Sequence, residues 1–173
     1  MGLGAVQGIA DQQLMEEWIA RYENDILRTC FFLLGDRSQA EDAAQDTFLK
    51  AWRSMAQFGG RNGSSEKTWL TRIAINTCKD YRRSKWLRHV DMSVEVESIP
   101  PGGYDLYPSD QSVFQEVMHL PGKYKQVILL YYYHHFTMEE IAQVLSAHVS
   151  TVHRQMNKAQ EMLKAILTKE GFK

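Results

Sequence analysis

Apolar residues recur at every third or fourth position through most of the chain, which is the spacing of amphipathic helices. Gly35-Asp36-Arg37 separates the first two predicted helices, and Ser38 with Glu41 predicts a capping box at the start of the second. The first helix has its apolar stripe at Met15, Trp18, Ile19, Tyr22, Ile26, Cys30 and Leu33. The second has it at Ala40, Ala44, Phe48 and Trp52.

A third helix follows a turn-rich break at residues 58–65, with apolar or small residues from Trp69 to Tyr81. Three such helices can close one small core, so residues 11–89 are predicted to form the first domain. Periodicity disappears over residues 90–110, where Pro100, Pro101 and Pro108 exclude a helix interior or a central strand. We interpret residues 90–110 as a flexible linker.

Residues 111–170 predict a second helical domain. A short helix ends at Pro121-Gly122, and another contains Val127 to Tyr131. Thr137 and Glu140 predict a capping box that opens a helix ending at Leu145, and the last helix covers residues 149–167. No strand pattern competes, so the predicted fold is all-α, with two small helical domains joined by the linker.

The distribution of charge changes this picture more than its total does. The formal net charge is -1, yet the segment Lys67 to Arg88 holds seven Lys and Arg residues against the single acid Asp80. The segment Asp91 to Glu116 holds six acids and no Lys or Arg, which makes the linker acidic. A basic helix beside an acidic segment indicates a nucleic-acid partner, although the near-zero net charge of the whole chain does not reveal it.

Several functional classes are excluded by what the sequence lacks. His134 and His135 are adjacent and have no third ligand at metal spacing, and no nucleophile triad, phosphate loop or dinucleotide fingerprint is present. We therefore expect no enzyme activity, metal, cofactor or small-molecule substrate.

Cys30 and Cys78 fall within apolar helical patterns and predict buried thiols. With no signal peptide and no apolar run near ~20 residues, we expect a cytoplasmic protein without membrane insertion.

The predicted helix pair on either side of Ser146-Ala147-His148 has the layout of a helix-turn-helix, whose second helix enters the DNA major groove. The same pattern fits an antiparallel helix pair with a solvated polar face. We expect Arg154 to read a guanine and Lys158 to contact the backbone, and the alternative for Arg154 is a phosphate anchor. The outward-facing candidates are Ser150, Thr151, His153, Arg154, Asn157 and Lys158.

The basic third helix interleaves aromatic residues with its cations, as surfaces that stack unpaired bases do. Trp69, Tyr81 and Trp86 are these aromatic residues. The alternative is that the tryptophans belong to the core and the Lys and Arg stems cover the helix.

Two sets of motifs resemble a known family. Residues 34–52 (LGDRSQAEDAAQDTFLKAW), with TWLTRIAIN at 68–76 and DYRR at 80–83, resemble sigma region two. LPGKY at 120–124, EEIAQVL at 139–145 and STV at 150–152 resemble sigma region four. From Met15 to Leu167 the chain is identified as similar to the extracytoplasmic-function group of sigma-70 factors.

This resemblance implies that the chain binds core RNA polymerase and promoter DNA, with an anti-sigma factor as antagonist. The helix of residues 40–52 would grip the β′ clamp through Asp42, Gln45, Asp46 and Phe48, with Asp46 as an exposed charge. The first domain would melt the -10 element and hold a flipped base near Asn76 and Phe58. The residues implied at the -10 element are Phe58, Lys67, Trp69, Arg72, Asn76, Lys79, Arg82 and Arg83.

The second domain would read the -35 element and contact the β flap, and the linker would thread toward the active-site channel. The sequence departs from the family pattern at His148, Ser150, His153, Gln155 and Gln160, so the recognition helix is less basic than usual.

Two other functions stay open. One is a helix-turn-helix regulator with a helical sensor domain and no polymerase contact. The other is a sigma-like chain kept for sequestration or assembly.

Overall fold

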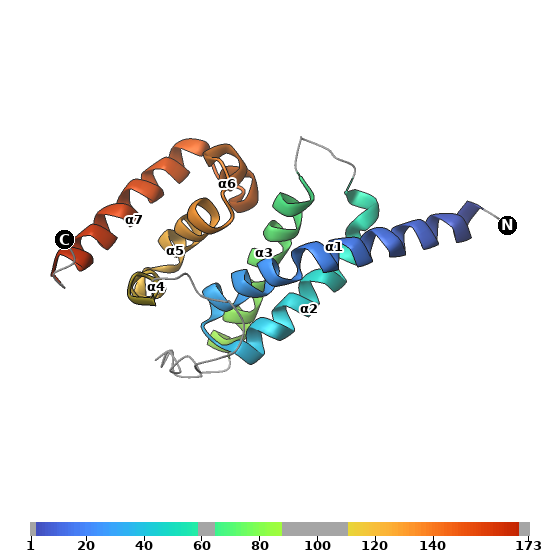
Figure 1. The fold of residues 1–173 in the computed structure, drawn as a ribbon, viewed down its shortest axis with the longest axis horizontal. Coiled ribbons are helices and arrows are strands. Elements are labelled where there is room, and N and C mark those ends of the chain that lie inside the picture. The colour runs from blue at the N-terminus through green and yellow to red at the C-terminus, as the bar shows by residue number, and fades with distance from the viewer. Residues whose placement is uncertain (1–2, 59–64, 88–110, 170–173) are drawn as a thin grey trace. The chain divides into compact units, whose positions relative to one another are not determined.

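The computed structural model describes residues 3–58, 65–87 and 111–169, and these residues are almost entirely helical (Figure 1). Side chains are described for residues 8–58, 65–84 and 115–168. The chain divides into two compact units, Met1–Val90 and Asp91–Lys173, here called unit 1 and unit 2. The all-α prediction is confirmed. The predicted linker at 90–110, most of the break at 58–65 and the side chain of Trp86 lie outside the described residues.

Unit 1 consists of three long helices that pack against one another in every pairing: α1 (Leu3–Leu34), α2 (Arg37–Ser54) and α3 (Glu66–Leu87). A short 3-10 turn, η1 (Met55–Gln57), follows α2. The core is built around Trp18, Ile26, Leu70 and Ile75, all almost fully buried. Helix α1 begins at Leu3, before the predicted domain start at residue 11, because no proline interrupts the preceding residues and each added residue extends the hydrogen-bonded helix.

The start of α2 corrects one prediction. Its N-cap is Asp36, whose Oδ1 accepts a hydrogen bond from the Gln39 amide at 2.7 Å. Ser38 lies inside the helix, and Glu41 pairs with Arg37 at 2.9 Å, so the Ser38–Glu41 capping box is wrong. Aspartate caps a helix as well as serine does, and Gly35, at a φ of 72°, ends α1 immediately before it.

The buried stripe of α2 is made of small side chains, which allows close approach of α1 and α3. It consists of Ala40, Ala43, Ala44, Thr47 and Ala51. Ala51 therefore takes the buried position at the end of α2 that the sequence pattern assigned to Trp52. Trp52 is 43% exposed, so the prediction that it packs in the core is wrong. An indole would hold the neighbouring helices apart at a position where methyl groups fit.

Unit 2 contains α4 (Gln111–His119), α5 (Gly122–Ile128), the π-helical turn η3 (Leu129–Tyr133), α6 (Met138–Leu145) and α7 (Val149–Lys169). Helix α7 packs on α4, α5 and α6. Core side chains include Val127, Leu130, Ile141 and Val152.

The predicted capping box at the start of α6 is confirmed. Thr137 Oγ1 accepts from the Glu140 amide at 3.2 Å, and Glu140 Oε2 accepts from the Thr137 amide at 2.8 Å. Helix α6 ends at Leu145, and the capping residue Ser146 has a φ of 53°, in the left-handed region that favours glycine. The predicted helix-turn-helix pair is thus formed by α6 and α7.

Candidate functional site

One face of α2 is exposed along its whole length, opposite the buried stripe of small residues. Asp42, Gln45, Leu49 and Trp52 follow one another at intervals of three or four residues and are all exposed. Leu49 is 51% exposed and Trp52 is 43% exposed. Large apolar side chains on a surface rimmed by polar groups are typical of a protein–protein contact. We call these four residues the α2 face.

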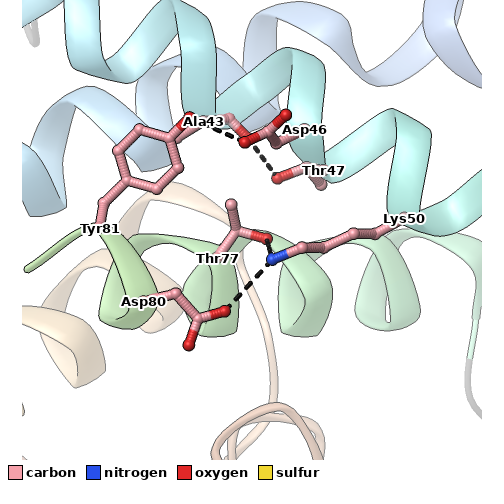
Figure 2. A network of polar contacts seen from close by, with 7 residues as sticks. All are labelled: Ala43, Asp46, Thr47, Lys50, Thr77, Asp80 and Tyr81. Atoms are coloured by element: carbon pink, nitrogen blue, oxygen red, sulfur yellow. Dashed lines mark hydrogen bonds and ion pairs between the residues drawn. The ribbon is translucent and has the colours of Figure 1, made fainter. Parts of the chain in front are cut away.

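The other two candidates on α2 lie beside this face. Asp46 and Phe48 are half-buried. Asp46 Oδ2 accepts a hydrogen bond from the Tyr81 hydroxyl of α3 at 2.8 Å, as Figure 2 shows. The expectation of a freely exposed Asp46 is therefore wrong, because this carboxylate joins α2 to α3.

Further polar contacts join the same two helices. Lys50 Nζ donates to Thr77 Oγ1 at 3.1 Å and contacts Asp80 Oδ2 at 3.2 Å (Figure 2). Burial, then the hydrogen bond and charge of Asp46, raise the pKa of Tyr81 to about 12. These contacts join α2 to α3 beside the buried stripe, on the flank of the α2 face.

Helix α3 presents a basic face to solvent. Arg72, Asn76, Lys79 and Arg83 recur at intervals of three or four residues and are exposed, as is the neighbouring Arg82. Asp80 is also exposed, but its charge is balanced by Lys50. The predicted -10 residues from 72 to 83 are therefore brought together on one cationic surface.

The three remaining -10 candidates lie at the beginning of α3 or in contact with it. Lys67 Nζ pairs with Asp25 Oδ2 of α1 at 3.5 Å and is directed toward that helix. The rings of Phe58 and Trp69 are 5.0 Å apart, and both contact the buried Trp18. Trp69 precedes Asn76 by two helical turns, about 10 Å along the axis. Phe58 thus contacts α3 at Trp69, two turns before Asn76.

The two cysteines are buried and free, as predicted. Its interaction with the Cys78 thiol of α3 and its burial raise the pKa of Cys30 of α1 far above its usual range, which keeps the thiol protonated.

In unit 2 the outward side of α7 carries the predicted -35 residues. Ser150, His153, Arg154, Asn157 and Lys158 are exposed, and Thr151 is half-buried. A hollow of about 590 Å³ lies between this side of α7 and the beginning of α5. It is lined by Lys123, Tyr124, Arg154, Gln155, Asn157, Lys158 and Glu161.

Comparison with known protein families matches each of the two units to a region of the sigma-70 factors. Residues 18–88 match the family model of Sigma-70 region 2, and residues 111–163 match that of Sigma-70, region 4. RNA polymerase sigma factor YlaC of Bacillus subtilis is 31% identical over 163 residues, covering 90% of this chain and 92% of the relative. The chain belongs to the sigma-70 family. The ECF RNA polymerase sigma-E factor of Salmonella typhimurium is 30% identical, covering 88% of this chain and 86% of the relative, which confirms the extracytoplasmic-function group.

Solved sigma factors share the fold. The sigma factor RpoE from Bartonella quintana, in complex with the anti-sigma factor NepR, matches with a TM-score of 0.72 and 23% identity, over 88% of this chain and 96% of that one. CnrH, in complex with the cytosolic domain of CnrY, matches with a TM-score of 0.68 and 23% identity, over 92% and 91% of the two chains.

Membership in the family confirms the predicted role. As a sigma factor the chain directs RNA polymerase to promoters, and it is an initiation factor without catalysis of its own. No helix in the described part of the chain is long and apolar enough to cross a membrane.

Sequence reasoning missed two groups of residues that lie on the surfaces described above. The exposed residues Leu49 and Trp52 were overlooked because the sequence pattern assigned the buried stripe of α2 to Trp52, whereas Ala51 is the buried residue. The run of Ala and Thr at 40, 43, 44, 47 and 51 was the available signal, since small residues at helical spacing indicate the closest helix contact. Lys123 and Glu161 had no such signal, because their proximity arises from the packing of α5 on α7.

Proposed function

We propose that unit 1 binds the β′ clamp of core RNA polymerase through the α2 face and melts the -10 element along α3. Unit 2 reads the -35 element with α7 and contacts the β flap. An anti-sigma factor holds the protein inactive in the cytoplasm until it is released.

The exposed apolar pair on the α2 face carries the polymerase part of this proposal. Leu49 and Trp52 lie on the same side of α2 as Asp42 and Gln45, away from the core of unit 1. Full burial of a leucine side chain contributes about 1.5–3 kcal/mol, and Leu49 and Trp52 each expose about half of their surface. Covering these exposed parts in an interface would therefore contribute on the order of 1 kcal/mol each, which a polar surface alone would not supply. Tryptophan is also among the residues that most often dominate protein interfaces.

The basic face of α3 supports the -10 part. Arg72, Lys79 and Arg83 are exposed around Asn76 and can neutralise the phosphates of a melted strand. Extruding a base costs a few kcal/mol of stacking, and contacts formed after extrusion offset that cost. Asn76 has amide donor and acceptor groups suited to the edge of such a base.

Two observations support the remaining parts. Helices α6 and α7 form the helix-turn-helix geometry in which the second helix enters the major groove. RpoE, which shares this fold, was solved in complex with an anti-sigma factor.

Reconstituted transcription tests the proposal. The full chain is added to core polymerase lacking any sigma factor, and promoter-specific transcripts are sought from its own genome. We expect transcripts with the wild type, and a marked loss of core binding when Leu49 and Trp52 are both replaced by Ser. Ile9→Ser is the matched control, because Ile9 is an exposed apolar residue on a different helix, α1.

The outcomes separate the alternatives. Core association without transcripts identifies a sequestering protein, and DNA binding without core association identifies an ordinary helix-turn-helix regulator. If the Leu49 and Trp52 variant binds core as tightly as the wild type, the α2 face is not the polymerase contact.

A further inference from the structure

The hollow between α5 and α7 brings together cations that are far apart in the sequence. Lys123 stands at the beginning of α5, and Arg154 and Lys158 are one turn apart on α7, yet all three line the same space. Lys123 Nζ lies 4.9 Å from the centre of the Tyr124 ring, a cation–π contact that holds the ammonium at this edge. The half-buried Tyr124 and Gln155 add polar groups to the lining.

The charges around the hollow are only partly compensated. Lys158 Nζ pairs with Glu161 Oε2 at 3.1 Å. Within the described residues, neither Lys123 nor Arg154 forms an ion pair with an acid. Two uncompensated cations facing one open hollow, with hydrogen-bonding side chains between them, favour an anionic ligand with several acceptor oxygens.

We propose that this hollow binds a backbone phosphate of duplex DNA, held jointly by Lys123 of α5 and Arg154 of α7. The proposal rests on the proposed function, in which α7 contacts the -35 element. It makes Lys123 a DNA contact outside the helix-turn-helix. It also assigns Arg154 the role of phosphate anchor and leaves base reading to residues nearer the start of α7, such as Ser150 and His153.

Glu161 has a defined place in this site. Its carboxylate occupies Lys158 and adds a negative charge to the lining, so it opposes a bound phosphate. Removing that charge frees Lys158 for the backbone. Glu161→Gln should therefore strengthen DNA binding, and misfolding does not produce such a gain.

The test uses holoenzyme assembled from the full chain and core polymerase, with a duplex library randomised across the -35 region as the probe. Affinity is measured at several salt concentrations. We expect Lys123→Ala and Arg154→Ala each to weaken binding about two- to fivefold for all sequences. Each should reduce the salt slope by about one while the preferred sequence stays unchanged. Lys164→Ala, an exposed cation of α7 that does not line the hollow, is the matched control and should leave the slope unchanged.

Three results would overturn the inference. If Arg154→Ala removes preference at one base pair, Arg154 reads a base. If Lys123→Ala leaves both affinity and salt slope unchanged while the -35 preference persists, the inference fails and the proposed function stands. If the wild-type holoenzyme shows no preference within the -35 region, the proposed function of unit 2 fails together with the inference.

Discussion

The hydrogen bond between Tyr81 and Asp46 leads to a quantitative prediction. Asp46→Asn keeps the size of the side chain but removes the charge that accepts from the Tyr81 hydroxyl at 2.8 Å. The pKa of Tyr81 is raised from 10 to about 12, first by burial and then by the hydrogen bond and charge of Asp46. Two pH units correspond to about 3 kcal/mol. Because Tyr81 is only half-buried and its burial survives the substitution, we expect Asp46→Asn to lower the free energy of unfolding by about 1 kcal/mol.

The sign of the pH dependence follows from the raised pKa. Folding favours the protonated phenol, so the contribution of Tyr81 to stability is fully present below pH 10. It is lost as the pH rises from 10 to about 12. The stability difference between wild type and Tyr81→Phe should therefore shrink across this interval.

Absorbance titration of tyrosinate checks the prediction, with helicity followed on the same samples. Subtracting the titration of Tyr81→Phe isolates Tyr81 from the other tyrosines of the chain. In Asp46→Asn the pKa of Tyr81 should fall from about 12 toward 10 and stay above 10, because burial is retained. An unchanged pKa in Asp46→Asn would refute the role assigned to this carboxylate.

Three further predictions follow from exposed or strained positions. Asp42→Arg should weaken core polymerase binding with an unchanged melting temperature, since Asp42 is exposed on the α2 face; a matching loss of stability would point to a folding defect. Asn76→Ala should slow promoter opening more than it weakens duplex binding, as permanganate footprinting of the -10 region would report; equal losses would place Asn76 in duplex contact. Ser146→Gly should raise the thermal stability of unit 2 by about 0.5–1 kcal/mol, because Ser146 has a φ of 53°; a lower melting temperature would show that its left-handed backbone is not strained.

The described helices could be predicted from sequence because their signals are local. Apolar spacing predicted α1, α2, α3 and α7, and the Thr137–Glu140 box marked the start of α6. The error at the start of α2 arose between two good capping residues, Asp36 and Ser38, which differ little in capping energy. Local chemistry therefore identifies a helix more reliably than it identifies its first residue.

Sequence by itself also determined the family, because the motifs of both units contain enough specific residues to match independently. Only the tertiary structure decided which residues share a surface. The rotation of α2 against α1 and α3 buried Ala51 and exposed Trp52, and it placed Asp46 against Tyr81. The packing of α5 on α7 brought Lys123 beside Arg154. Such relations depend on how closely helices approach and at what angle, which side-chain volumes across the whole core set together.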